Sequence, residues 1–270
     1  MRICRIRDEY LGGPGVVGYL FYYENARRFY IEIADGLDYW SAPMLFDWYV
    51  KNDIECMDST WSFRWVTARI VPPDRQNIAQ ILRNSGMDSY DEYKLLLYAD
   101  GRCAQDDCMV EEIREEELPD YIRERMKRHI QAVFPLTENR VVVFFRNNTS
   151  CVCNITSTVG GDPRFSRILR SSDVFSNVRV SEGGYGIRWD DEREIPYYVL
   201  AHTPVDYSLK YTDICCIIEH ETFDTAQVTE RLNCSRQNID DLVRRGRLHP
   251  VKTGARSKLF IRSEVEERLW

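Results

Sequence analysis

The sequence predicts an α+β protein made of two small mixed modules, followed by a C-terminal segment of short helices and a strand pair. Runs rich in β-branched and aromatic residues come in pairs, and turn-forming residues separate the members of each pair. Short stretches with helical periodicity lie between these pairs. Together these patterns are typical of antiparallel hairpins combined with short helices.

Composition narrows the class of protein. The chain has 270 residues, of which 44% are hydrophobic and 29% charged, as in ordinary globular proteins of two or three domains. No apolar run approaches the ~20 residues that a membrane span needs. Charges occupy the N-terminus where a secretory signal would be apolar. We therefore expect a cytoplasmic protein without membrane contact, whose nine cysteines are reduced thiols.

The charge is distributed unevenly. Between Arg231 and Arg262 there are nine basic residues and two acidic ones, a net charge of +7. Because the whole chain carries −7, the remainder carries −14. A basic segment on an acidic body indicates one anion-binding module attached to a larger protein.

The first module is expected at residues 1–113. Gly18–Tyr23 and Phe29–Ile33 form a strand pair joined around Glu24 and Asn25. Helical patterns follow, and residue types that favour helix starts precede several of them. The expected helices are Pro43–Asn52, Trp61–Ile70 with Ser59 or Thr60 as N-cap, Arg75–Ser85 capped by Asp74, and Asp91–Tyr98.

A charged helical linker is expected at residues 114–137, with its helix at about Glu117–Phe134 and Pro119 in the first turn. The second module follows at residues 138–220. It contains two hairpins, the first of which turns at Asn147-Asn148, residues that tolerate a positive φ. The expected elements are Arg140–Arg146 paired with Thr149–Ile155, a helix at Pro163–Arg170, a turn at Asp173–Asn177, Val178–Val180 paired with Tyr185–Trp189, and a short helix from Pro196.

The stretch RVVVFFRNNTSCVCNI…RFSRILRSSDVFSNVRVSEGGYGIRW resembles a family of small bacterial α+β domains of unknown function. Domains of that family occur alone or fused to a helix-turn-helix. The resemblance implies a regulatory or interaction role and no known catalytic residues.

A pair of capped helices is expected in the C-terminal domain, residues 221–270. Asp224 and Gln227 form a capping box that opens the first helix. Asn233 suits the tight turn that follows, because asparagine tolerates the left-handed conformation. Ser235 then caps a second helix to about Arg245, and Gly246 ends it. This order of parts predicts a helix-turn-helix.

Two short strands follow the helix pair, with a basic, glycine-containing tip between them at Lys252–Lys258. Such a hairpin is the wing of a winged helix-turn-helix. Ser263 and Glu266 suggest a capping box for a last short helix.

The C-terminal domain resembles the MerR and phage-excisionase superfamily of winged helix-turn-helix domains over nearly all of Phe223–Trp270. It departs from the family pattern at Thr229 and Asn233, and both departures are tolerable. The resemblance implies binding to double-stranded DNA. Its specific elements are Thr225-Ala226, Leu232, Ser235–Ile239, Leu242, Gly246–Leu248, Pro250, Gly254, Arg256 and Ile261–Val265.

The docking geometry of such domains assigns the site residues. The N-terminal end of the second helix faces the base edges, so Ser235, Arg236, Gln237 and Asn238 are the expected base contacts. The expected phosphate contacts are Arg244, Arg245, Arg247, Lys252, Arg256 and Lys258. Asp240 and Asp241 would repel phosphates, and we expect them to pair with Arg244 and Arg245 instead. The alternative use of the same fold is protein contact.

Other motifs carry weaker signals. The cysteines Cys103 and Cys108, Cys151 and Cys153, and Cys215-Cys216 near His220 lack the paired spacing of a zinc module, so we expect no metal and no cofactor. Asp106 and Asp107 could support acid–base chemistry, but a solvated turn is the simpler interpretation. The turn Gly12–Gly15 lacks the Lys and Ser/Thr of a phosphate loop. Core packing accounts for most of the aromatic residues of the first module.

The sequence therefore predicts a bacterial-type, sequence-specific DNA-binding protein, a transcriptional regulator without enzymatic activity. One small domain buries little DNA surface, so we expect a homodimer, with the N-terminal modules providing dimerisation or sensing of a signal or protein partner. The alternative is an antitoxin-like or phage-related interaction protein whose DNA binding serves autoregulation. A third interpretation makes the first module an enzyme that uses Asp106 or Asp107.

Overall fold

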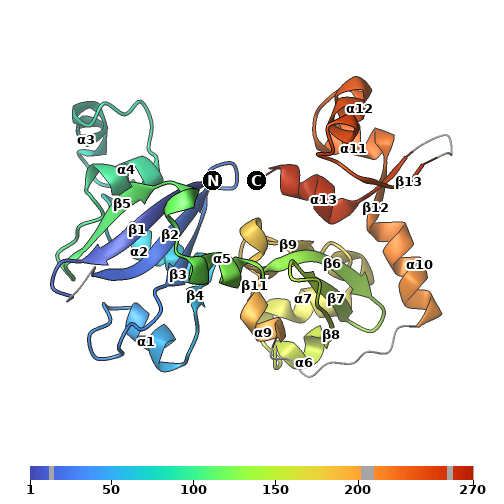
Figure 1. Cartoon of the computed structure of the whole chain (residues 1–270), viewed down its shortest axis with the longest axis horizontal. Coiled ribbons are helices and arrows are strands. Elements are labelled where there is room, and N and C mark those ends of the chain that lie inside the picture. Colours follow the sequence, from blue (N-terminus) through green and yellow to red (C-terminus); the bar gives the residue numbers. More distant parts are fainter. Residues whose placement is uncertain (12–14, 202–209, 254–257, 270) are drawn as a thin grey trace. The chain divides into compact units, whose positions relative to one another are not determined.

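The computed structural model describes residues 1–11, 15–201, 210–253 and 258–269. The chain divides into two compact units, Met1–Glu124 and Arg125–Trp270 (Figure 1). Throughout the described ranges, short helices accompany strands that pair in an antiparallel manner, which confirms the α+β class. Most of the Gly12–Gly15 turn and the tip of the expected wing lie outside the described residues.

The first unit is built on a five-stranded antiparallel sheet in the order β4-β3-β2-β1-β5. The expected strand pair is present as the central β2 and β3. Three further strands were not predicted; β1 alternates arginine with isoleucine and cysteine, and β5 carries two adjacent glutamates. The strands are β1 (Arg2–Asp8), β2 (Val16–Tyr23), β3 (Arg28–Ile33), β4 (Cys56–Met57) and β5 (Cys108–Ile113).

All four expected helices of this unit are present, but two N-caps were predicted incorrectly. Asp58, not Ser59 or Thr60, caps α2, because its carboxylate accepts a hydrogen bond from Trp61 N at 3.0 Å. Asp74 caps nothing, since α3 starts later, after Asn77. The helices are α1 (Phe46–Lys51), α2 (Ser59–Thr67), α3 (Ile78–Asn84) and α4 (Glu92–Tyr98).

Aromatic side chains fill much of the core of the first unit. The Tyr22 ring stacks on Phe29 and on Tyr93, with centroid distances of 4.4 and 4.8 Å. Trp65 is fully buried. Core packing therefore explains most of the aromatic residues, as expected, although Trp40 remains 88% exposed.

The predicted helix Glu117–Phe134 is wrong in its second half. Glu115–Glu117 forms a 3-10 turn (η1) and Asp120–Met126 forms α5, with Pro119 directly before it. The chain then enters a strand, β6 (Ile130–Leu136), which pairs with the following strand of the second unit. The run contains Ile, Val and Phe, and cross-strand pairing decides its conformation.

The second unit starts with two small sheets, in the orders β6-β7-β8 and β11-β10-β9. Both expected hairpins are confirmed, and Asn148 adopts a φ of 63° in the first turn. The elements are β7 (Arg140–Phe145), β8 (Ser150–Asn154), α6 (Ile155–Thr158), η2 (Pro163–Phe165), α7 (Ser166–Arg170), α8 (Ser172–Phe175), β9 (Arg179–Val180), η3 (Glu182–Gly184), β10 (Gly186–Arg188), β11 (Glu194–Pro196) and α9 (Tyr197–Ala201).

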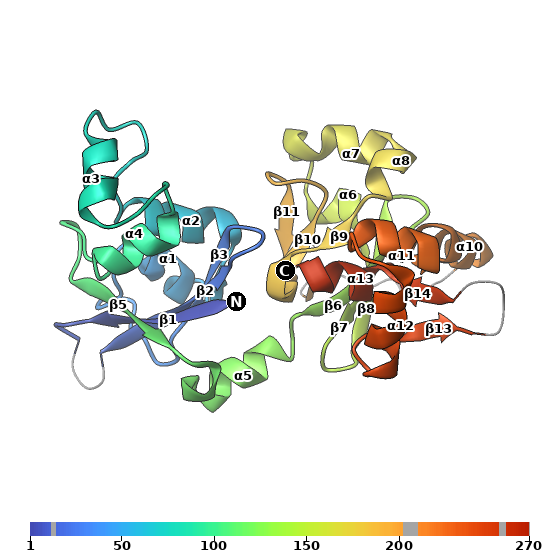
Figure 2. The ribbon, with the colours of Figure 1, turned by 90° about the horizontal axis from the view of Figure 1, so that it is seen from above.

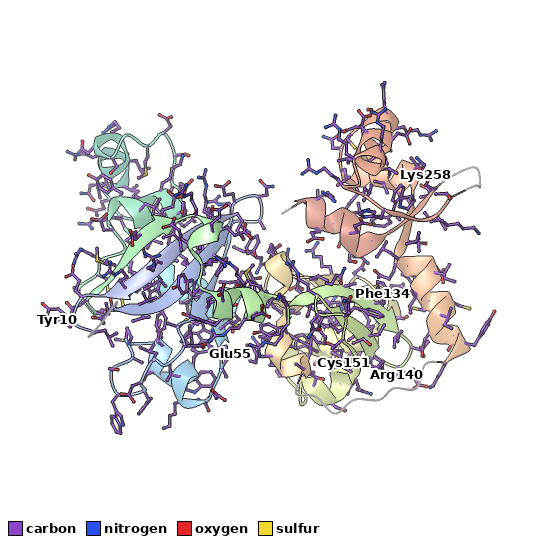
Figure 3. All side chains as sticks on the ribbon, in the orientation of Figure 1. Tyr10, Glu55, Phe134, Arg140, Cys151 and Lys258 are labelled. Carbon is purple, nitrogen blue, oxygen red and sulfur yellow. The ribbon has the colours of Figure 1, made fainter. Side chains whose placement is uncertain are left out.

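Helix α10 (Tyr211–His220) was not predicted. It packs on β6, and Ile217 contacts the small cluster of Leu136, Val142 and Val152 (Figure 1). Asp213 is fully buried on the same side of the helix and pairs with Arg140 at 2.8 Å, where β7 begins (Figure 3).

The C-terminal elements of the second unit form a third small sheet, β12-β14-β13, with three helices and a 3-10 turn. Figure 2 shows α11, α12 and the β13–β14 pair gathered together. Their core consists of Val228, Ile239, Leu248, Phe260 and Val265. The elements are β12 (Thr222–Asp224), α11 (Thr225–Arg231), α12 (Arg236–Arg244), β13 (Pro250–Lys252), β14 (Leu259–Ile261), α13 (Arg262–Glu266) and η4 (Glu267–Leu269).

The expected capping box of the last helix is absent. Ile261 precedes α13 as its N-cap without a side-chain hydrogen bond, and Ser263 lies inside the helix. The carboxylate of Glu266 instead accepts hydrogen bonds from Arg231 and Arg262. Two arginine partners outcompete a single backbone N–H for this carboxylate, since charge-assisted hydrogen bonds are the stronger ones.

Candidate nucleic-acid interface

Local hydrogen bonds fix the start of α11 and the turn after it. Asp224 Oδ1 accepts from Gln227 N, and Gln227 Oε1 accepts from Asp224 N, both at 2.8 Å. This is the predicted capping box. Asn233 follows the helix with a φ of 47°, in the left-handed region, as its residue type indicated.

Helix α12 is closed at both ends by the predicted residues. The Ser235 hydroxyl accepts a hydrogen bond from Asn238 N at 3.2 Å. Beyond the helix, Gly246 has a φ of 63°, and Arg247 N donates to Leu242 O at 2.8 Å. This is the glycine-terminated end that satisfies the last carbonyls of a helix.

The two faces of α12 differ sharply. Ile239 is fully buried in the core, and Leu242 and Val243 pack against that core as partly buried residues. The first turn, Arg236–Asn238, is exposed, and so is its cap, Ser235. All four predicted base-contacting side chains are therefore presented at the N-terminal end of one anchored helix, where the helix dipole favours an anion.

The predicted phosphate contacts fall into three groups. Arg245, Arg247 and Lys252 are exposed and form no ion pair with any other described residue. Arg244 pairs with Asp241, and Lys258 Nζ lies 2.6 Å from Asp240 Oδ1. Arg256 lies outside the described residues.

The expected pairing of the two aspartates is correct only in part. Asp241 does pair with Arg244, three residues on, but Asp240 pairs with Lys258 rather than with an arginine of its own helix. Lys258 directly precedes β14 (Figure 3), so this pair links α12 to the strand pair. Because both pairs are partly solvent-exposed, each contributes only ~0–1 kcal/mol to stability.

Two arginines of the basic segment serve other contacts. Arg231 pairs with Glu266 at 2.9 Å, and Arg262 lies 3.3 Å from both Glu221 and Glu266. Glu221 was not singled out from the sequence, and Glu266 was assigned to a capping box with Ser263 rather than to these arginines, although the i,i+4 spacing of Arg262 and Glu266 was a usable signal. The exposed cations without an ion pair in the described part of this segment are Arg236, Arg245, Arg247 and Lys252.

The other candidate sites consist of structural contacts. Asp106 pairs with the buried Arg69 and accepts from Cys108 N at 3.1 Å, whereas Asp107 is exposed. Cys151 and Cys153 lie side by side on β8, with 3.5 Å between their sulfur atoms. Within the described ranges, no group of three His, Cys, Asp or Glu residues is arranged to hold a metal. Helices long and apolar enough to cross a bilayer are also absent from these ranges.

No family model, curated protein or solved structure matches the chain. The geometry of the C-terminal elements is therefore the main evidence on function.

Proposed function

We propose that the C-terminal elements form a winged helix-turn-helix of the MerR and excisionase type, and that the chain is a sequence-specific regulator of transcription. The observation that carries this proposal is the exposed first turn of α12 above a buried Ile239. Three unpaired cations, Arg245, Arg247 and Lys252, extend the exposed surface from the end of α12 to β13. In this proposal α12 is the recognition helix, and the β13–β14 pair is the wing.

Each exposed group has a defined partner on a DNA duplex. In the major groove, Arg236 suits the O6 and N7 acceptors of guanine, and Gln237 or Asn238 suits adenine. Each good bidentate contact discriminates between bases by ~1–3 kcal/mol. The cations at the end of α12 and in β13 contact phosphates, which fixes the register without specifying sequence.

The aspartates limit the affinity of one copy. Phosphate binding by Arg244 or Lys258 has to compete with Asp241 or Asp240. A second copy of the domain doubles the number of phosphate and base contacts, so the proposal includes a homodimer on a two-part DNA site.

Two substitutions in the full chain test DNA binding directly. Arg236→Ala should weaken binding to a preferred duplex about tenfold or more, because a base contact of ~1–3 kcal/mol is lost. Lys252→Ala should weaken binding to all duplexes, and the negative slope of log K against log salt concentration should become less steep by about 1. Fluorescence anisotropy of labelled duplexes at several salt concentrations measures both effects.

Arg170→Ala is the matched control, since Arg170 is exposed at the end of α7, outside the proposed interface. It should bind DNA like the unmodified chain. Unchanged DNA binding by both Arg236→Ala and Lys252→Ala at low salt would refute the proposal.

A further inference from the structure

A groove of about 800 Å³ opens in the second unit between the β9–β10 hairpin and the C-terminal elements. Arg179 and Trp189 line it from the hairpin side, and Phe223, Arg231 and Arg262 line it from the other side. These residues belong to β9, β12, α11 and α13, apart from Trp189, which directly follows β10. The groove thus joins the middle of the chain to the proposed DNA-binding domain.

Arg179 forms no ion pair with the described residues of this groove, although Glu266 lies near enough to favour its charged form. It lies directly opposite Arg188 in the β9–β10 register, and like charges at such positions destabilise a sheet. Arg188 is neutralised by Glu182 and Asp191. Arg179 has no ion pair within the described residues, and its Nε is buried without a hydrogen-bond partner. Burial, together with the nearby charge of Arg188, lowers the pKa of Arg179 below its usual value.

The opposite wall holds two more arginines that share one carboxylate. Glu266 Oε1 accepts from Arg231 Nη2 at 2.9 Å and from Arg262 Nε at 3.3 Å. Arg262 also lies 3.3 Å from Glu221. Burial raises the pKa of Glu221 to about 8, so this side chain is mostly uncharged at neutral pH.

The remaining acidic side chains that line the groove, Asp173, Asp190 and Glu219, form no ion pair with these three arginines. Asp190 is paired with Arg193. Asp173 and Glu219 are solvent-exposed. Among the described residues, Arg231 and Arg262 each have a carboxylate within ion-pair distance and Arg179 has none, and an unsatisfied buried donor such as Arg179 Nε is costly unless it serves a function.

We propose that this groove binds a small organic anion, whose carboxylate or phosphate group meets Arg179 and Arg231 and whose flat apolar part packs against Trp189 and Phe223. Carboxylate and phosphate groups match the planar, forked donors of arginine. The indole N–H of Trp189 is already bonded to Phe175 O at 2.8 Å, and its ring packs against Phe165 and Phe175, so the 8% of Trp189 that is exposed is the part available to a ligand. Such a ligand contacts elements on both sides of the groove at once.

A ligand at this position acts as an effector, an inference that rests on the proposed DNA-binding function. Arg231 ends α11, and α11 packs on α12, the proposed recognition helix. A ligand that contacts both Arg179 in β9 and Arg231 in α11 holds these two elements together. This restricts the orientations that α12 can adopt. Coupling between two sites typically changes the affinity of each about 5- to 150-fold, and by the same factor in both directions.

Binding of simple aromatic anions to the full chain tests the proposal. The probes are phenyl phosphate and benzoate, with inorganic phosphate as a third probe that lacks the apolar part, and calorimetry measures their affinity. At least one aromatic anion should bind at least tenfold more tightly than inorganic phosphate. The stronger of the two identifies the preferred anionic group.

Variants locate the site. Arg179→Gln should weaken the binding of the aromatic anion at least tenfold, Arg179→Lys should recover part of the loss, and Arg170→Gln should have no effect. Equal binding by Arg179→Gln and the unmodified chain would overturn the proposal, and so would the absence of binding by both aromatic probes. Circular dichroism confirms that each variant is folded.

DNA binding is measured separately on the same variants, so the two proposals can fail independently. Without an anion, Arg179→Gln should bind DNA like the unmodified chain. With the aromatic anion present, only the unmodified chain should change its DNA affinity. If the chain binds the anion through Arg179 but never binds DNA, the groove remains an anion-binding site and its role as an effector site is rejected.

Discussion

Asp213 shows how one buried carboxylate fixes a helix. Burial would raise its pKa, but hydrogen bonds from Lys210 N and from the hydroxyl and N–H of Thr137, together with the charge of Arg140, hold the pKa at about 2. The carboxylate therefore joins the start of α10 to the loop before β7 and to β7 itself. Removing its charge would leave the buried Arg140 without this carboxylate, which is strongly destabilising.

The low pKa of Asp213 predicts a pH dependence of stability. The folded-state value, about 2, lies below the ordinary value of 3.8, so the stabilisation is fully present above pH 4 and is lost as the pH falls from 4 to 2. Its size is about 2 kcal/mol. Asp213→Asn should lower the free energy of unfolding by at least that amount at pH 7, as measured by urea denaturation. Asp88→Asn, at an exposed position, should change little; equal losses in the two variants would contradict this role of Asp213.

Residue-level predictions of helix caps succeeded at α11 and α12, whereas the caps predicted at Ser59 or Thr60, Asp74 and Ser263 were wrong. Asp224, Asn233, Ser235 and Gly246 act within a few residues of their own positions, and all four behave as expected. The partner of Asp240 was missed because Lys258 lies 18 residues away and reaches it only through the fold. Arg179 was not predicted as a site residue, because a single arginine in a short strand belongs to no recognisable sequence motif.

At the scale of the element, the closure of α12 by Gly246 is a feature that can be tested. A φ of 63° suits glycine and, to a lesser degree, asparagine. Gly246→Ala should lower the free energy of unfolding by about 1 kcal/mol, whereas Gly246→Asn should lower it by a smaller amount. Thermal unfolding of both variants measures the difference. Equal stability of the alanine variant and the unmodified chain would show that the left-handed end is not required.

Two elements were predicted wrongly because hydrophobic periodicity within a segment does not report contacts with distant segments. The run Ile130–Phe134 was assigned to the end of a helix that starts in charged sequence, yet pairing with β7 makes Ile130–Leu136 a strand. Helix α10 was missed because its buried side carries Asp213 beside Ile217, so apolar spacing alone did not mark that face. Both outcomes depend on contacts between distant segments, which override local propensity.

At the scale of the whole molecule, the proposed dimer needs a surface. The exposed side of α10 is apolar: Tyr211, Ile214 and Ile218 are 81%, 49% and 59% exposed. Patches of this kind often mark protein contacts.

This surface predicts the effect of one substitution on the oligomeric state. Ile218→Glu should convert a dimer into a monomer in sedimentation experiments, because it buries a charge in the contact. Met44→Glu, at a position of the first unit that is 55% exposed, should leave the oligomeric state unchanged. A chain that is monomeric without substitution would reject the homodimer, and a co-purifying heterologous partner would favour the interaction-protein alternative.

The fold class and most elements could be predicted from the sequence, because hairpin turns and helix caps are local signals. The exposed end of α12 could also be predicted, since its cap and its buried Ile239 share one short segment. The groove could not, because its walls come from segments far apart in the sequence; Arg179 and Glu266, for example, are 87 residues apart.

Selection of bound duplexes from a random double-stranded library, at a stated salt concentration, tests the central claim most directly. The full chain should enrich a recurrent short sequence, and Arg236→Ala should lose preference at one position of that sequence while keeping the others. Failure of the unmodified chain to enrich any sequence, with equal retention of all duplexes, would contradict the account.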